Sequence, residues 1–204
     1  MAAQSTTPGK VFLIRHGEKL GDGGSDKDGG PNLSLQGSAR AAAIPTLFVP
    51  ASPEFDCTIK ADTSAFKASY GTQSLSGATP RFDTPDFIFA TADSSHSSRP
   101  RETATPVAMA LGVPFDDTTY SDKHHDIKKL AKDLTSDATY SGKVILICWH
   151  HGTIPDLAQE LGVANPPPWD GSTVFDRVWV IDFANTPLAV SDQPQMLLYG
   201  DSAT

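Results

Sequence analysis

Short apolar runs alternate with helical segments along this chain, and this alternation constrains the fold more than any other feature of the sequence. Apolar runs that are typical of buried strands span residues 10–16, 86–92 and 143–149. Segments with helical spacing or helix-ending residues span residues 34–48, 100–111, 126–134 and 153–161. Strands that alternate with helices predict an α/β layer fold built on a largely parallel sheet.

Weaker signals predict an edge strand, a terminal hairpin, the start of one helix and the end of another. The segment around Pro114 predicts an edge strand, because proline cannot donate a backbone hydrogen bond to a neighbour on that side. Residues 177–183 and 195–201 are separated by a turn that contains proline, and they predict a terminal hairpin. We expect Ser34 to cap the first helix and Gly112 to end the second.

The length of 204 residues predicts a single domain over residues 1–204. Residues 51–85 are rich in Ser, Thr, Pro and Gly, and we interpret them as a loop-rich insertion rather than a second domain. The N-terminal segment has no apolar core, and no apolar run reaches the length of a membrane-spanning helix. Cys57 and Cys148 form no paired motif, so we expect a cytoplasmic protein with reduced thiols.

The balance of charge argues against two classes of partner. The chain has 16 Lys and Arg residues against 24 Asp and Glu residues, a formal net charge of −8, and a pI near 5.1. Nucleic acids and anionic membranes are bound through a basic face, so neither is expected as a partner. An anionic substrate must instead be held by a few cations that gather at one place.

Polar residues end or follow three of the expected strands, at the edge of a parallel sheet where ligands bind. In chain order these residues are Arg15, His16, Ser95, Arg99, His150, His151 and Gly152. Guanidinium groups donate in pairs to phosphate oxygens, and a neutral imidazole is a nucleophile or a proton carrier. The combination favours transfer of a phosphoryl group to a histidine without a metal, because side chains supply the positive charge.

The motifs at these positions resemble those of the histidine phosphatase superfamily, which is also called phosphoglycerate-mutase-like. RHGE at residues 15–18 resembles the motif whose histidine becomes phosphorylated. The block at residues 95–104 (SHSSRPRETA) resembles the second motif, whose leading arginine clamps phosphate. The strand that runs into His151 and the following glycine resembles the segment with the second catalytic histidine.

A fourth similarity lies between the first two motifs, where Leu33, Ser34 and Gly37 resemble the helix start that follows the first loop in the family. The resemblance covers about residues 10–183, with its motifs in the family's order. It implies a three-layer α/β/α sandwich with a mostly parallel central sheet.

The resemblance also implies roles for individual residues. His16 would be the nucleophile, and Arg15, Arg99 and His151 would hold the phosphoryl group. Glu18 is expected to order the loop and the arginine behind it. Further candidates for substrate binding are Ser95, which alternatively caps a helix, and Gly152.

The family's usual proton donor is missing from this sequence. Many members carry a glutamate after the third strand, whereas residues 118–126 (TTYSDKHHD) contain none. Asp122 is our candidate for the general acid, and a solvated turn residue is the alternative interpretation. The other candidates are His125, Asp126 and His150, although alternation along the strand points His150 to the opposite face.

Taken together, the motifs predict a metal-independent phosphomonoester hydrolase that acts through a phosphohistidine on a small phosphorylated metabolite. The alternatives are a phosphoglycerate-mutase-type phosphotransferase and a catalytically weak phosphate-binding regulatory module. No cofactor is expected, and the adjacent His124 and His125 are not interpreted as a metal pair. The loops expected to line the pocket are residues 21–30, 51–85 and 166–171. They carry few charges that would bind a highly anionic substrate, which favours a small or partly apolar one.

Overall fold

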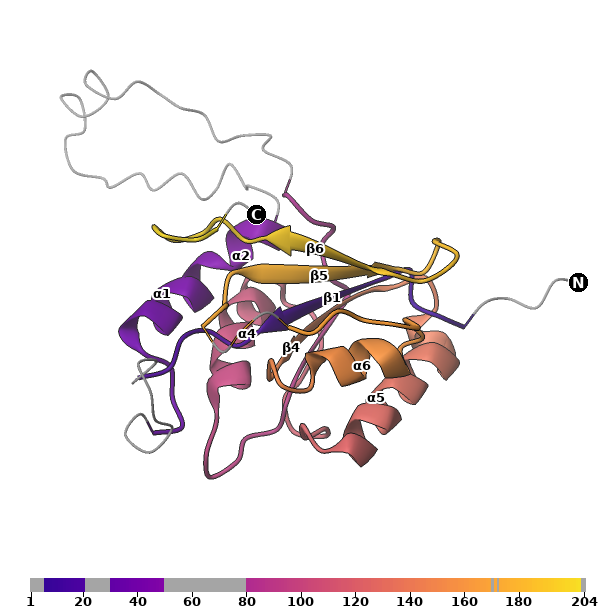
Figure 1. The fold of residues 1–204 in the computed structure, drawn as a ribbon, viewed down its shortest axis with the longest axis horizontal. Coiled ribbons are helices and arrows are strands. Elements are labelled where there is room, and N and C mark those ends of the chain that lie inside the picture. The colour runs from indigo at the N-terminus through magenta and orange to yellow at the C-terminus, as the bar shows by residue number, and fades with distance from the viewer. Residues whose placement is uncertain (1–5, 21–29, 50–79, 170, 172, 203–204) are drawn as a thin grey trace, which may run out of the picture.

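The computed structural model describes residues 6–20, 30–49, 80–169, 171 and 173–202 (Figure 1). Within this part of the chain, six strands form one sheet in the order β3-β2-β4-β1-β5-β6. Their bounds are β1 Lys10–Arg15, β2 Phe87–Ala90, β3 Phe115–Asp116, β4 Val144–Trp149, β5 Arg177–Asp182 and β6 Val190–Pro194. Strands β3, β2, β4 and β1 are parallel, and β5 and β6 continue the sheet as an antiparallel hairpin. The prediction of a mostly parallel sheet is confirmed.

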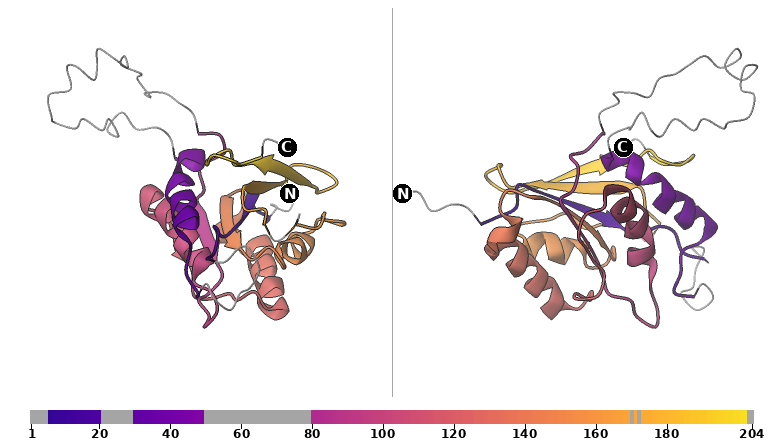
Figure 2. Two further views of the ribbon diagram at one scale, coloured as in Figure 1. Left: turned by 60° about the vertical axis from the view of Figure 1, so that its left-hand side comes forward. Right: turned by 180° about the vertical axis from the view of Figure 1, so that it is seen from behind.

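Helices cover both faces of this sheet. The described helices are α1 Leu35–Ala43, α2 Pro45–Phe48, α4 Arg99–Leu111, α5 His124–Ser136 and α6 Ile154–Glu160, with a 3₁₀ turn at Ala138–Tyr140. Helices α1, α2 and α4 lie on one face, and α5 and α6 lie on the other (Figure 2). This arrangement is the expected three-layer α/β/α sandwich. Among the helices just named, none has both the length and the apolar sequence that crossing a membrane requires.

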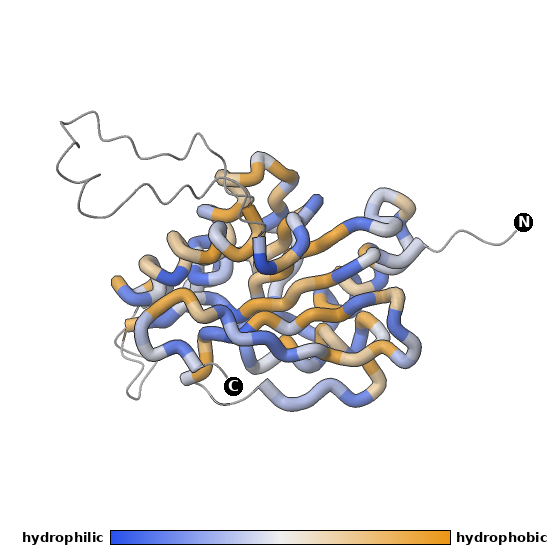
Figure 3. The backbone as a smooth tube through the Cα atoms, turned by 90° about the horizontal axis from the view of Figure 1, so that it is seen from above, coloured by the Kyte–Doolittle hydropathy of each residue, from blue (hydrophilic) through white to orange (hydrophobic). Residues whose placement is uncertain are grey.

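Alternate side chains of β1 enter two separate hydrophobic clusters, one on each face of the sheet. Leu13 packs in one cluster with Ile127 of α5 and Leu157 of α6. Phe12 packs in the other cluster with Val107 of α4. Because both faces are covered, the central strands contain uninterrupted apolar runs, such as residues 11–14 of β1, and hydrophobic stretches gather in these strands at the centre of Figure 3.

The helix ends follow the local sequence. The Ser34 hydroxyl oxygen accepts a hydrogen bond from the Gly37 backbone N–H at 3.0 Å, and Gly112 ends α4 with a positive φ of 65°. Both residues act as predicted. The helix expected over residues 34–48 is divided into α1 and α2 at Pro45, because the proline nitrogen carries no hydrogen for the preceding turn.

The terminal hairpin was predicted in the wrong place. Strand β5 pairs with Val190–Pro194, and residues 195–201 are not a strand. These residues instead form a turn in which the backbone N–H groups of Leu197 and Leu198 donate to the Asp201 carboxylate at 2.8 and 3.0 Å. Strand β6 lies at the edge of the sheet, so its polar sequence VSDQP is tolerated, and it therefore carries no apolar signal.

The expected insertion is described only at its end. Residues 50–79 lie outside the described residues, so the loop-rich insertion and the single domain over residues 1–204 stay predictions. After this segment, the Phe82 ring packs against Phe12 and Phe48, with centroid distances of 5.4 and 5.6 Å. The chain thus returns on the α2 side of the sheet before it enters β2. The short edge strand β3, which follows Pro114, is confirmed.

Candidate active site

The pairing of the two central strands brings two histidines together. Strands β1 and β4 are parallel, and their last paired residues are Arg15 and Trp149. The backbone N–H of His16 continues this ladder by donating to the Trp149 carbonyl oxygen at 3.1 Å. The next residue of each strand therefore lies beside its counterpart, and the ring centroids of His16 and His150 are 5.2 Å apart.

His16 is held as a neutral imidazole in a defined orientation. Its side chain is buried, and its Nδ1 lies 2.7 Å from the Gly17 carbonyl oxygen. Because a carbonyl oxygen only accepts, Nδ1 carries the proton and Nε2 carries the lone pair. Burial holds the pKa of His16 well below 6.5, and the nearby charges of Arg15 and Arg99 lower it further. His16 is therefore poised as a nucleophile at neutral pH.

Arg15 places a buried guanidinium beside this imidazole. It is the last residue of β1 and is only 1% exposed. Its Nη1 donates to the Val174 carbonyl oxygen at 2.9 Å, and its Cζ lies 3.6 Å from the centroid of the Phe175 ring. The hydrogen bond and the cation–π contact fix the guanidinium on the segment that precedes β5.

Arg99 approaches the same imidazole from α4. It begins this helix, is buried, and donates from Nη1 to the Gly30 carbonyl oxygen at 3.0 Å. The Thr103 hydroxyl links the helix to residues 16–20, which follow β1 and are called the histidine loop below. It accepts a hydrogen bond from the Gly17 N–H at 2.8 Å and donates one to the Arg99 carbonyl oxygen at 2.7 Å. Thr103 therefore sets the position of the histidine loop relative to the start of α4.

The structure places His150 against His16. Burial lowers the pKa of His150 from 6.5 to about 4, and the charge of Arg99 adds to this shift. The expectation that strand alternation points His150 to the opposite face is wrong. Strand β4 ends at Trp149, so the alternation of side chains along the strand no longer applies at His150. His151 is half-buried one residue further along, where its charge also lowers the pKa of His150.

The four candidates for the general acid occupy different environments. Asp122 is exposed, and its carboxylate charge raises the pKa of His150, which shows that it lies within electrostatic reach of the site. Asp126 accepts hydrogen bonds from the hydroxyl and the N–H of Ser121, and these bonds lower its pKa. The His125 ring is 75% exposed and pairs with Asp126 at 3.3 Å. The general acid stays a prediction, with Asp122 as the exposed candidate whose charge acts on His150.

The remaining sequence candidates lie at the rim of this arrangement. Ser95 is exposed in the loop between β2 and α4, and Gly152 is exposed between β4 and α6. Ser98 precedes α4 without a capping hydrogen bond from its side chain. In residues 6–20, 30–49 and 80–202, apart from the two positions that are not described, no group of three His, Cys, Asp or Glu side chains is arranged to hold a metal ion.

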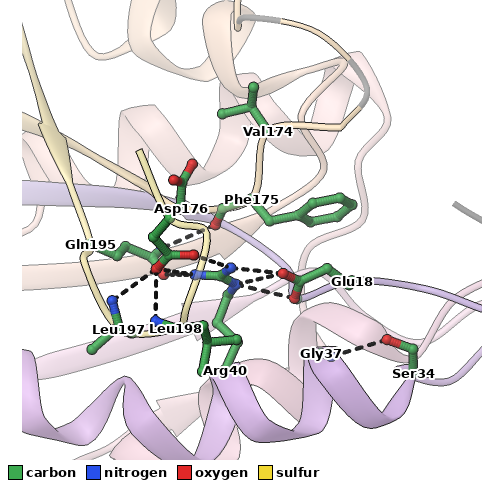
Figure 4. Close-up of polar contacts among 12 residues, drawn as sticks. Glu18, Ser34, Gly37, Arg40, Val174, Phe175, Asp176, Gln195, Leu197 and Leu198 are labelled. Atoms are coloured by element: carbon green, nitrogen blue, oxygen red, sulfur yellow. Dashed lines mark hydrogen bonds and ion pairs between the residues drawn. The ribbon is translucent and has the colours of Figure 1, made fainter. Parts of the chain in front are cut away.

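Glu18 orders the histidine loop through an arginine that the sequence analysis did not single out. It accepts hydrogen bonds from Arg40 of α1, with an Nη2–Oε1 distance of 2.7 Å (Figure 4). Arg40 also donates to the carboxylate of Asp201 at 2.8 and 3.0 Å and to the side-chain oxygen of Gln195 at 3.0 Å. The arginine that Glu18 binds is thus Arg40.

Three residues of this arrangement escaped the sequence analysis, and two of them carried some signal. Arg40 is a lone basic residue inside the Ala-rich helix LQGSARAAA, where it falls on the buried face. Thr103 lies four residues after Arg99, one turn along the same helix face. Phe175 has no local signal, because its contact with Arg15 is made between segments far apart in the sequence.

Comparisons with known proteins bear on the fold. No family model and no curated protein matches this sequence. The structure is similar to an Escherichia coli protein described as an alpha-ribazole-5'-P phosphatase, with 14% identity, a TM-score of 0.52, and coverage of 90% of this chain and 96% of that chain. It is similar to a phosphoglycerate mutase from Bacillus anthracis, with 11% identity, a TM-score of 0.50, and coverage of 88% and 90%.

A third similar structure is an Agrobacterium tumefaciens protein described as the phosphohistidine phosphatase SixA, with 18% identity, a TM-score of 0.48, and coverage of 91% and 97%. The likenesses to the first two structures show that this chain has the phosphoglycerate-mutase-like fold. The fold that the resemblance implied is thus confirmed.

Replacing Arg40 will destabilise the protein far more than replacing an exposed arginine. Arg40→Met leaves Glu18 and Asp201 buried without their counter-charge, which costs about 3–5 kcal/mol. The matched control is Arg101→Met, which removes an exposed pair with Asp93 and costs less than about 1 kcal/mol. Urea unfolding measures both, and equal losses would contradict a structural role for the Arg40 cluster.

Removing the His150 imidazole will flatten the pH dependence of stability. Because burial lowers the pKa of His150 from 6.5 to about 4, the unfolded chain binds a proton in this window that the folded chain does not bind. The free energy of unfolding is therefore not reduced by this group above pH 6.5, and it decreases as the pH falls toward 4. His150 accounts for up to about 3 kcal/mol of this decrease in the free energy of unfolding.

We expect His150→Gln to lose less stability across this pH window than the unmodified chain, measured by urea unfolding in phosphate-free buffer. The same replacement at the exposed His124 is the control, and it should leave the pH profile unchanged. Parallel profiles for the His150 variant and the unmodified chain would show that His150 is not buried in its neutral form.

Proposed function

We propose that the protein is a metal-independent phosphomonoester hydrolase and that His16 carries the phosphoryl group in a covalent intermediate. The observation that carries this proposal is the neutral His16 imidazole, whose Nδ1 is occupied by a carbonyl oxygen while two buried guanidinium groups lie nearby. The similarity to structures described as an alpha-ribazole-5'-P phosphatase and a phosphoglycerate mutase supports it. The proposal retains the expected substrate class, a small phosphorylated metabolite, and the expected cytoplasmic location.

In the first step, Nε2 of His16 bonds to phosphorus as the ester P–O bond breaks. Arg15 and Arg99 stabilise the charge on the transferred oxygens, and their burial strengthens this interaction because little water screens it. The proton on Nδ1 stays hydrogen-bonded to the Gly17 carbonyl oxygen while the ring gains positive charge. Asp122, in its acid form, gives a proton to the leaving alkoxide, which departs as the alcohol.

In the second step, a water oxygen bonds to phosphorus as the P–N bond to His16 breaks. The proton that the water loses passes to the Asp122 carboxylate, which restores the acid form for the next cycle. His150 faces His16. Because its imidazole is neutral, one ring nitrogen carries a proton that can be donated to a phosphoryl oxygen. The products are the alcohol and inorganic phosphate, and the protein returns to its starting state.

A phosphate-binding module with weak turnover is the second candidate. It is favoured by the exposed position of Asp122, since an exposed carboxyl group is not positioned by packing around it. A module of this kind would bind phosphate or vanadate without measurable turnover on any phosphomonoester. A mutase would instead return phosphate to a second hydroxyl group, which product analysis with a phosphorylated triose acid detects.

His16→Ala will abolish hydrolysis of p-nitrophenyl phosphate. We expect a loss of at least about 10³-fold in kcat, because the variant lacks the atom to which phosphorus is transferred. Hydrolysis by the unmodified protein should persist with a chelator present. His124→Ala, at an exposed histidine, is the matched control and should retain full activity. Turnover that survives in the His16 variant would reject the proposed mechanism.

Asp122→Asn will slow the hydrolysis of alkyl phosphates much more than that of p-nitrophenyl phosphate. An alkoxide needs a proton to leave, whereas p-nitrophenolate leaves without one, so we expect a loss of about 10²–10⁴-fold with alkyl substrates only. Asp126→Asn is the control, because its carboxylate holds Ser121 and should affect both substrates equally. An equal loss with both substrates in the Asp122 variant would exclude proton donation by this residue.

A further inference from the structure

A hollow of about 460 Å³ opens next to the histidine pair. It adjoins the site through Phe175, whose ring centroid lies 6.1 Å from that of His16 and 3.6 Å from Cζ of Arg15. Its lining residues are Glu18, Lys19, Leu20, Ser34, Leu35, Gln36, Thr173 and Phe175. The hollow therefore begins where the phosphate-binding groups end, and its size is that of a site for a small organic ligand.

Two exposed leucines form part of the wall of this hollow. Leu20 is 52% exposed and Leu35 is 91% exposed, although both side chains are apolar. Leu35 is the first residue of α1, one position after the capping Ser34, and its exposed side chain adds almost nothing to the core. Exposed aliphatic side chains that share one concave surface are typical of ligand-binding sites.

The charges in the lining are nearly balanced. Lys19 contributes one cation and Glu18 one carboxylate, and that carboxylate is bound by Arg40. The other side chains of the lining are apolar or are neutral hydroxyl and amide groups. This surface matches an uncharged organic group much better than a second phosphate, which needs several cations of its own.

We propose that this hollow binds the alcohol portion of the substrate and that the substrate is a phosphomonoester of an apolar, uncharged alcohol. The inference rests on the proposed function and adds the chemical class of the leaving group. With the phosphoryl group between Arg15 and Arg99, the ester oxygen leads toward Phe175, and the carbon chain lies against Leu35. Leu35 is thus a residue that determines specificity.

The test compares hexyl phosphate with ethyl phosphate. Both have primary alkyl leaving groups of nearly equal acidity, so the chemical step is the same and the two differ in chain contact alone. We expect the unmodified protein to prefer hexyl phosphate by at least about ten-fold in kcat/KM. Burial of two of the additional methylene groups of the hexyl chain is enough for a difference of that size.

Leu35→Ser should remove most of this preference by lowering kcat/KM for hexyl phosphate much more than that for ethyl phosphate. Leu35→Met should retain the preference, because it keeps an apolar side chain of similar volume. Met109→Ser is the matched control: Met109 is 78% exposed on α4 and does not line the hollow, so its replacement should change neither rate.

The possible failures of the two proposals differ. Equal kcat/KM values for the two esters in the unmodified protein would overturn the inference and leave the proposed function intact. A preference that survives unchanged in Leu35→Ser would overturn the assignment of the hollow. If the unmodified protein hydrolysed neither ester nor p-nitrophenyl phosphate, the proposed function itself would fail, and the inference would fail with it.

Discussion

The pairing of β1 with β4 is the constraint on which the rest of the site depends. Six residue pairs fix the register, and the backbone bond from His16 to Trp149 extends it by one step. Both strands are covered on both faces, so a shift of one residue would move every apolar side chain to the wrong cluster. The positions of His16 and His150 are therefore held by the stability of the whole core rather than by local contacts.

The arginines of this protein have two different electrostatic roles. Arg40 is bound by the carboxylates of Glu18 and Asp201, so its charge is balanced within the fold and it ties the C-terminal turn to the histidine loop. Arg15 and Arg99 are buried beside His16 instead, where they donate to the carbonyl oxygens of Val174 and Gly30. Two guanidinium groups thus gather at one place in a protein whose net charge is −8.

The sequence predicted elements best where local rules and packing agree. The core strands were recognised because both of their faces are buried, and the α4 boundaries because Gly112 ends the helix as local chemistry requires. The position of β6 was missed because an edge strand needs little apolar sequence. The pairing of Glu18 with Arg40 was missed because these residues lie 22 positions apart and meet only when α1 packs beside the histidine loop.

By itself, the sequence determined the α/β class, the order of the polar residues after the strands, and the sign of the charge that must gather there. These follow from periodicity and residue chemistry, which act over a few neighbouring positions. Only the tertiary structure decided that His150 faces His16 and that Phe175 lies on Arg15. Both depend on the register and packing of segments more than a hundred residues apart, and interactions at that distance are set by the buried core as a whole.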